Sequence, residues 1–360
     1  MATGPSVAGP MNAYIPNWEA SGKLRVAFSR NPASFPVAGY MKMVGTPKNT
    51  GYWKRWLGQA HARVIDDKRF AWPYGKPRPQ PTENAMFEYV EFREKRRTFG
   101  YDFDQETVDQ ADEDTVAIER AGKAALCMTA RTARVATLLT TTSNWATSAD
   151  GNLSANHYST SSAFGYGDLS AGSATDPRLF NTVNKIAEII TKDSLGIVSE
   201  VPATTSLVMN PTTARKLAGS QELVEYLKGS PSAYARIVGR LHRNAQFGLP
   251  EELFGHNLII ENTVKVTSER RATLAQSFAF PDDTIAVVTR YGDIDGHFNA
   301  AANTAGTDFS TVTAFYKEDM TVEEFSDTKN RLLDGYVTEQ LIEVLTCPAT
   351  GYLLTSVFTD

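Results

Sequence analysis

The sequence is poor in cysteine and histidine. Its 360 residues include only two cysteines, Cys127 and Cys347, which lie far apart. A disulfide framework is therefore not expected, one chain cannot form a four-cysteine metal site, and buried free thiols are expected. The five histidines show no HxxxH or HExxH spacing that would place two ligands on one helical face. We expect neither a metal nor a cofactor.

Long apolar runs and an excess of positive charge are also absent. No stretch of about 18 uninterrupted apolar residues is present, and residues 1–22 lack the apolar core of a signal peptide, so neither a membrane span nor export is expected. The formal net charge of -5 excludes a global basic field. Any contact with double-stranded DNA is therefore expected to be weak and non-specific.

Motifs for catalysis are missing in the same way. The turn at Asp293–Gly296 superficially resembles a calcium loop but lacks the remaining ligands and the closing glutamate. Gly165–Gly167 follows no apolar strand and precedes no Gly-Lys-Ser/Thr, and no Gly-x-Ser-x-Gly elbow occurs. The sequence thus predicts a protein that is not an enzyme, with a soluble α+β enzyme of unrecognised site as one alternative.

The N-terminal third of the chain is organised by composition. Residues 1–49 are rich in Pro, Gly and Ala and predict an extended arm. Residues 50–103 alternate aromatic and basic residues at the period of a strand, interrupted by a proline-rich segment at 72–81. This pattern predicts a long two-stranded hairpin that requires a surface to lie on, and a neighbouring subunit is a natural candidate.

Residues 104–142 repeat apolar positions every three or four residues and predict one long helix of about 50 Å. A Ser/Thr/Gly-rich tract at 143–175 predicts a flexible surface loop. Helices at 179–192 and 210–228, the second capped by Asn210-Pro211, alternate with strands near 206–209, 257–266, 284–289, 310–325, 332–344 and 351–358. The mixture predicts an α+β fold.

Charge changes sign between the predicted hairpin and the predicted helix. Residues 51–100 hold eleven Lys/Arg against six Asp/Glu, whereas residues 101–119 hold eight acids and no base. These could be two solvated faces, or Lys95–Arg97 and its aromatic neighbours could form a nucleic-acid platform. A third hypothesis is that the basic hairpin of one copy lies over the acidic helix start of the next, where charge selects partner and register.

The order of arm, hairpin, long helix and α+β body resembles the Hong Kong 97-type fold of tailed-phage major capsid proteins. Local sequence is similar at Ala130–Leu139 with Ser143–Trp145, at Leu207–Leu217, at Phe247–Pro250 leading to Ile259-Ile260, and at Tyr336–Phe358. The resemblance implies an N-arm at 1–49, an E-loop at 50–103, a P-domain spine helix with its loop at 104–179, an A-domain at 180–310 and closing A/P-domain strands at 311–360.

The resemblance further implies an icosahedral shell subunit of a virion, assembled in the host cytoplasm from pentamers and hexamers of itself. A scaffolding protein, a portal, a decoration protein and packaged double-stranded DNA are the implied partners. An encapsulin-type compartment shell is the alternative with the same fold. Hairpin and helix residues are predicted to form the intersubunit interface: Trp53, Lys54, Arg55, Trp56, Phe92, Arg93, Lys95, Arg96, Arg97, Asp109, Asp112 and Glu113.

Overall fold

The computed structural model forms two compact units. The smaller contains Arg96–Met128 and Glu318–Glu339, and the larger contains Phe35–Lys95, Thr129–Lys317 and Gln340–Asp360. The structure describes residues 30–57, 74, 86–110, 114–145, 157–159, 168–173, 175–194, 196–200, 204–228, 247, 249–269, 272–291, 310–327 and 331–358.

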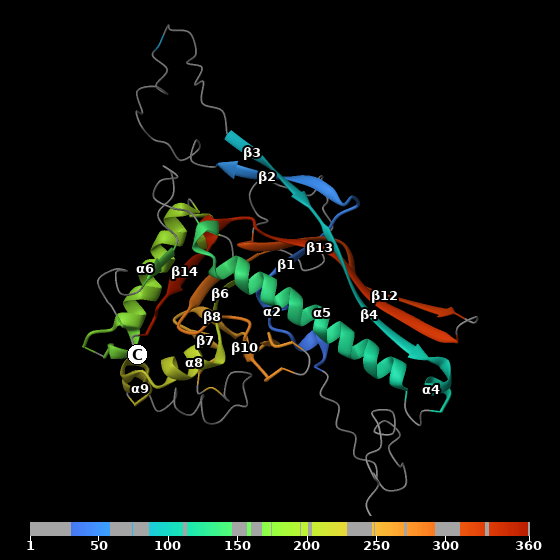
Figure 1. The fold of residues 1–360 in the computed structure, drawn as a ribbon. Helices are drawn as coiled ribbons and strands as arrows, with labels where there is room; N and C mark the ends of the chain where they lie inside the picture. The colour runs from blue at the N-terminus through green and yellow to red at the C-terminus, as the bar shows by residue number, and fades with distance from the viewer. Residues whose placement is uncertain are drawn as a thin grey trace, which may run out of the picture. The chain divides into compact units, whose positions relative to one another are not determined.

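The larger unit is built on a six-stranded mixed sheet (Figure 1). Its strands, in spatial order, are β5 (His157–Ser159), β14 (Tyr352–Thr355), β11 (Ile285–Arg290), β6 (Thr204–Met209), β8 (His256–Ile260) and β7 (Glu252–Leu253). Strand β6 pairs antiparallel with β11 and parallel with β8. Strand β11 begins with the continuous apolar run Ile-Ala-Val-Val, as expected for a strand covered on both faces, and β6 ends in Leu-Val-Met.

Helices α6 (Arg178–Asp193), α8 (Pro211–Ala218) and α9 (Gln221–Lys228) close the core of this unit. Asn210 accepts a hydrogen bond from the Thr213 amide at 2.8 Å, and Pro211 occupies the first turn, so the predicted cap is confirmed. The prediction of one helix to residue 228 is wrong. The chain turns at Gly219 and Ser220, where the Gly219 amide donates a hydrogen bond to the Arg215 carbonyl. Helix α9 then begins as a separate helix.

The Ser/Thr/Gly-rich tract contributes to this unit more than predicted. Its described residues include β5, which pairs parallel with β14, and Leu169, which is buried. At its start, Trp145 is buried and its indole nitrogen donates to the Leu139 carbonyl at 2.7 Å. The prediction of a surface loop throughout 143–175 is therefore wrong for these segments. The average composition of a segment does not show that single residues within it are buried.

The predicted arm ends in packed structure. Helix α2 (Val37–Tyr40) is buried through Val37 and Tyr40, and β1 (Lys42–Gly45) pairs parallel with β12 (Val312–Asp327). The Tyr40 hydroxyl donates to the buried Glu261 carboxylate at 3.0 Å. Residues 35–45 are therefore part of the larger unit, while residues 1–29 of the predicted arm lie outside the described residues.

Strand β2 (Thr50–Leu57) pairs antiparallel with β3 (Met86–Arg93) from Thr50 opposite Arg93 to Leu57 opposite Met86. The two strands of the predicted hairpin thus pair with each other. The predicted second strand of the hairpin is divided, because a further strand, β4 (Lys95–Asp104), follows β3 after Glu94. Of the proline-rich segment at 72–81, only Tyr74 lies within the described residues.

The predicted helix over 104–142 is two helices. The short α4 (Gln105–Asp109) begins at Asp104, whose side chain caps it, and α5 (Thr115–Thr140) begins after Asp114, which accepts from the Ala117 amide. A carboxylate at each N-terminus satisfies free backbone amides, so the acid-rich stretch favours two starts instead of one. At 26 residues α5 is about 39 Å long.

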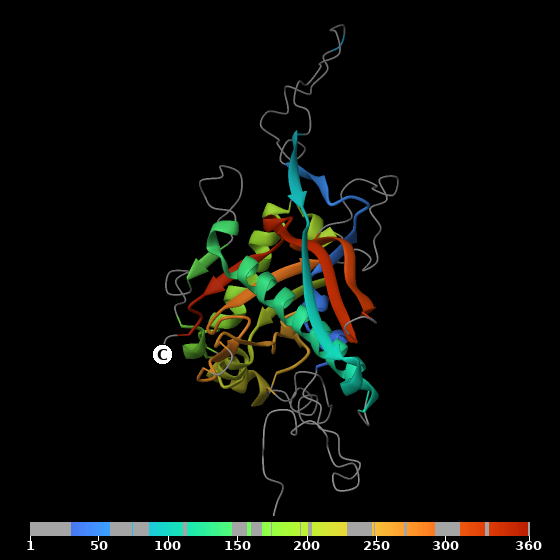
Figure 2. The same ribbon diagram turned by 45° about the vertical axis from the view of Figure 1, so that its right-hand side comes forward.

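A four-stranded sheet contains, in spatial order, β1, β12, β13 (Leu332–Leu345) and β4. Helix α5 runs along this sheet (Figure 2). In the smaller unit Cys127 donates to Glu339 of β13 at 3.2 Å, and in the larger unit Arg134 forms an ion pair with Glu343 of β13 at 2.7 Å. The helix is thus held to β13 by polar contacts within each unit.

Candidate assembly interface

One face of the β2–β3 hairpin anchors it to its own chain. The register places Gly51 and Trp53 on the same face as Phe92 and Val90. Phe92 is buried and stacks on Phe315 with ring centroids 4.4 Å apart. A Cβ on Gly51 would lie 2.6 Å from the Phe92 ring, so only glycine allows this close approach. Trp53 packs against the apolar cluster that Phe92 and Phe315 form with Val44.

The opposite face of the hairpin is open. Thr50 and Tyr52 of β2 share it with Tyr89, Glu91 and Arg93 of β3. Tyr52 and Tyr89 are 62% and 61% exposed, and they lie diagonally across the strand pair because Tyr52 is opposite Glu91. Aromatic residues and arginine are enriched where protein surfaces bind one another, whereas glutamate is depleted there. This outer face of the hairpin is the strongest candidate docking surface.

The structure divides the predicted basic residues into two groups. Arg96 is 4.0 Å from Glu323, and Arg97 is 3.6 Å from Glu339, whose side chain is completely buried. Both therefore bind carboxylates of their own chain. Arg93 and Lys95 are exposed. Lys54, Arg55 and Trp56 are placed by the strand register opposite Tyr89, Glu88 and Phe87.

The structure describes only one of the three predicted acidic interface residues. Asp109 is exposed and ends α4, not the first turn of the long helix. Asp112 and Glu113 lie outside the described residues. The exposed, described members of the predicted charge pairing are Arg93, Lys95, Arg96 and Asp109, and Arg96 already has Glu323 of its own chain as a partner. The pairing between copies stays a prediction.

Comparison with known proteins gives a result at the level of structure alone. No protein-family model matches the sequence, and no curated protein matches it. The mature capsid of bacteriophage PhiM1 aligns over 93% of this chain and 90% of its own, with a TM-score of 0.55 and 14% identity. A structure from Mycobacterium phage Che8 aligns over 96% and 98%, with a TM-score of 0.52 and 13% identity. The capsid of a native GTA particle aligns over 100% of both chains, with a TM-score of 0.50 and 13% identity.

The chain has the fold of bacteriophage capsid proteins. This confirms the α+β capsid fold predicted from the order of elements. At such low identity the likeness extends to the fold, whereas side chains at the surface are this chain's own. The match covers at least nine tenths of both chains in each of these comparisons.

One feature of this capsid fold was missed from the sequence. Glu339 is fully buried between the thiol of Cys127 and the guanidinium of Arg97. A buried carboxylate requires such partners, because an isolated charge in the interior is costly. Its neighbours in sequence, Thr338 and Gln340, gave no signal that this position is buried. Of the predicted buried thiols, Cys127 is fully buried, whereas Cys347 is only partly buried.

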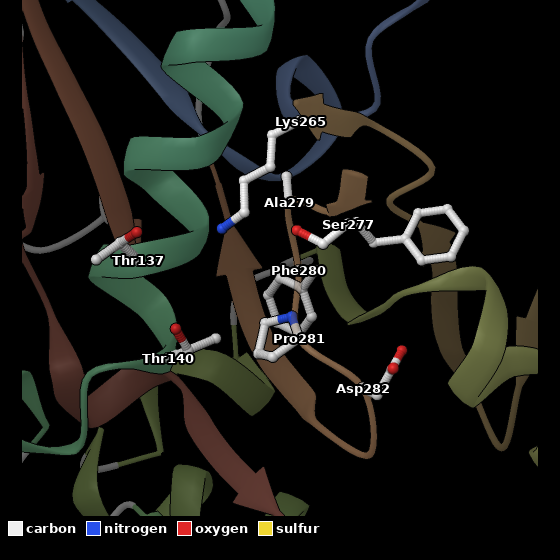
Figure 3. Close-up of a pocket in the computed structure, with 9 residues that line it drawn as sticks. Thr137, Thr140, Lys265, Ser277, Ala279, Phe280, Pro281 and Asp282 are labelled. Atoms are coloured by element: carbon white, nitrogen blue, oxygen red, sulfur yellow. The ribbon is translucent and has the colours of Figure 1, made fainter. Parts of the chain in front are cut away.

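A pocket of about 300 Å³, lined by both polar and apolar side chains, lies in the larger unit of the capsid fold (Figure 3). Thr137 and Thr140 of α5 line it together with Lys265 of β9 (Val264–Val266) and Ser277 of β10 (Gln276–Phe278). In Figure 3 the Lys265 ammonium points away from Asp282, which instead accepts from Asn210.

The rest of the described chain shows no better candidate for chemistry. Within these residues no three His, Cys, Asp or Glu side chains gather closely enough to hold a metal ion. Among the described helices, none combines the length and apolar character needed to cross a bilayer. The hairpin therefore remains the surface with the clearest physical signature of a function.

Proposed function

We propose that this chain is the major capsid protein of a tailed bacteriophage or a related particle, a structural subunit that assembles with copies of itself into an icosahedral shell around double-stranded DNA. The observation that carries the proposal is the end-to-end match to capsid structures over 93% and 100% of the chain. The fold alone does not fix function. The open, aromatic outer face of the hairpin supplies an independent reason to expect a protein partner.

The physical logic is repetition. A single contact through Tyr52, Tyr89 and the flanking charges would be small and partly polar, which is typical of weak interfaces. In a closed shell each copy repeats the same contacts around every symmetry axis, so modest free energies add to a stable container. A scaffolding protein, a portal and a decoration protein are the partners proposed with this role, and packaged DNA would be held by weak contacts.

Negative-stain electron microscopy with light scattering, on the chain alone and with a candidate scaffolding protein, tests the proposal. Closed shells or rings of five and six copies are expected. A monodisperse monomer under every condition would refute it. The contents of the particles then separate two roles, since nucleic acid is expected for a virion and a protein cargo for a compartment shell.

A charge swap tests the proposed pairing of hairpin and α4. The double change Arg93→Glu and Lys95→Glu is expected to leave a folded chain that assembles poorly, because both side chains are exposed. Adding Asp109→Lys is expected to restore assembly, since the swapped charges attract again. Arg97 must be excluded from this test, because reversing it would place two carboxylates together at the buried Glu339.

The swap has two informative outcomes. Recovery in the triple variant, with unchanged melting temperature throughout, supports a contact between copies at these residues. Full assembly by the double variant would contradict the charge pairing while leaving the capsid proposal intact.

A further inference from the structure

The first half of α5, in the smaller unit, has an apolar outward face. On the side toward the sheet, Cys127 is fully buried and Arg120 forms an ion pair with Glu324 of β12 at 3.2 Å. Ile118 lies nine residues before Cys127, about two and a half turns, so it points the opposite way. Ile118 is 45% exposed, and Leu126, farther along the same side, is 48% exposed. Two large apolar side chains thus lie where a helix usually carries charges.

Gly122 lies midway between these two side chains. Within the described residues, a Cβ on Gly122 would meet no atom within 4 Å. Glycine weakens the interior of a helix, and no neighbour in its own chain requires it at this position. Two helices approach most closely where a residue has no side chain. Ile118, Gly122 and Leu126 therefore form a docking surface with a notch at its centre, the Gly122 face.

The Gly122 face is complementary to a second copy of itself that runs antiparallel. A two-fold axis at Gly122 brings Ile118 of each copy to Leu126 of the other, since both lie four residues from the centre. The flank beside Leu126 carries Glu119 and Lys123, which pair within the chain at 3.3 Å. The same flank of both helices meets in this crossing, so Glu119 of each copy approaches Lys123 of the other. A carboxylate has two oxygens and an ammonium three donors, so the pair within each chain is kept.

A parallel crossing has neither advantage. It would bring the flank of Glu119 and Lys123 to the opposite flank, where Ala121 and Ala125 carry no charge, and it would align the two helix dipoles unfavourably. We propose that two copies of this chain pack α5 against α5, antiparallel, across a two-fold axis at Gly122. The inference rests on the proposed function and names one contact of the assembled shell. A face of this size is far below the roughly 800 Å² per partner of a stable complex, so the contact is expected within particles and not between free subunits.

Disulfide trapping in mixed assemblies tests the contact and its direction. Chains carrying Ile118→Cys are assembled with differently tagged chains carrying Leu126→Cys, and the particles are oxidised and separated on a non-reducing gel. A band containing both tags is expected. Particles of Ile118→Cys chains alone should give no such dimer, because the two positions would lie about 12 Å apart along the helices. A dimer of Ile118→Cys chains in place of the mixed band would overturn the antiparallel contact. Wild-type particles set the background from Cys127 and Cys347.

Filling the notch provides the second readout. Gly122→Leu, added to both chains, is expected to lower the mixed disulfide about tenfold, because the new side chain holds the two helices apart. The subunit should still fold, since leucine favours a helix and the space at Gly122 is open. Ala121→Leu, at an exposed position on the other flank, is the matched control and should leave the disulfide unchanged.

The outcomes separate this contact from the proposed function. Particles that form without any mixed disulfide, or with one that Gly122→Leu leaves unchanged, would overturn the contact alone and assign the face to a different partner. Failure to form particles under any condition would instead count against the capsid proposal.

Discussion

At the scale of single residues, two glycines and two tyrosines fit together across β4 and β13. A Cβ on Gly335 would lie 2.0 Å from the Tyr101 ring, and one on Gly100 would lie 3.1 Å from Tyr336. Each ring covers the bare backbone of a glycine on the other strand, a device that shields and pins strand pairs.

Gly335→Ala is therefore expected to destabilise the protein by about 1–3 kcal/mol, because the added methyl group overlaps the Tyr101 ring. The matched control is Gly122→Ala in α5, where the new methyl group meets no atom within 4 Å. That change should stabilise the helix by about 0.5–1 kcal/mol. Chemical denaturation measures both. Equal effects of the two substitutions would contradict the packing argument.

Glu222, a residue of α9, binds the backbone amides at the start of α6. Its fully buried carboxylate accepts from the Leu179 amide at 2.8 Å and the Phe180 amide at 3.0 Å. Glu222→Ala would leave both amides without an acceptor, so a loss of about 3 kcal/mol in the free energy of unfolding is expected. Glu222→Gln retains one acceptor oxygen and should cost less. Glu188→Ala, on the exposed face of α6, should leave the melting temperature nearly unchanged.

Tyr101 predicts a pH dependence. Burial and the hydrogen bond that its hydroxyl donates to Glu324 raise the pKa of Tyr101 to about 12. Since the unfolded value is about 10, the folded state holds the proton more tightly. The resulting stabilisation is complete below about pH 10 and is lost as the pH rises toward 12. The melting temperature of the wild type relative to Tyr101→Phe should fall over that range. A constant difference would contradict it.

At the scale of elements, the hairpin has one face for its own chain and one for a partner. Phe92 on the inner face stacks on Phe315, whereas Tyr89 on the outer face is largely exposed. Phe92→Ala is therefore expected to cost about 3–4 kcal/mol of stability. Tyr89→Ala should leave the melting temperature of the free subunit unchanged while lowering particle yield. The two readouts would exchange if the faces were assigned the wrong way round.

Helices α4 and α5 show how capping divides an apparently continuous pattern. The apolar repeat continues through residues 104–142, but Asp104 and Asp114 each accept a backbone amide at a helix start. Periodicity reports which face of a helix is apolar and says little about where a helix begins. The turn at Gly219 between α8 and α9 is a second example, since the apolar pattern alone predicted one helix there and did not indicate where it ends.

At the scale of the whole molecule, the charge pairing proposed between copies implies a dependence on salt. The charges concerned, at Arg93, Lys95 and Asp109, are all exposed. The screening length falls from about 10 Å at 0.1 M salt to about 3 Å at 1 M. Assembly followed by light scattering should therefore slow as salt rises over this range. Faster assembly at high salt would indicate that apolar burial at Tyr52 and Tyr89 dominates instead.

The local sequence by itself determined the features that depend on neighbours in the chain. Alternation near residues 52–56 and 87–93 predicted the paired strands, and Asn210-Pro211 predicted the start of α8, because strand pleat and helix caps are set within a few residues. The order of such elements was enough to predict the capsid fold.

Only the tertiary structure decided which distant residues meet. Arg97 was predicted to face a neighbouring copy, yet it lies beside the buried Glu339, and Phe92 lies against Phe315. Cys127 contacts Glu339 across 212 positions of the sequence. Burial and ion pairing depend on how strands and helices are brought together in space, and no local pattern encodes the partner that a side chain will find there.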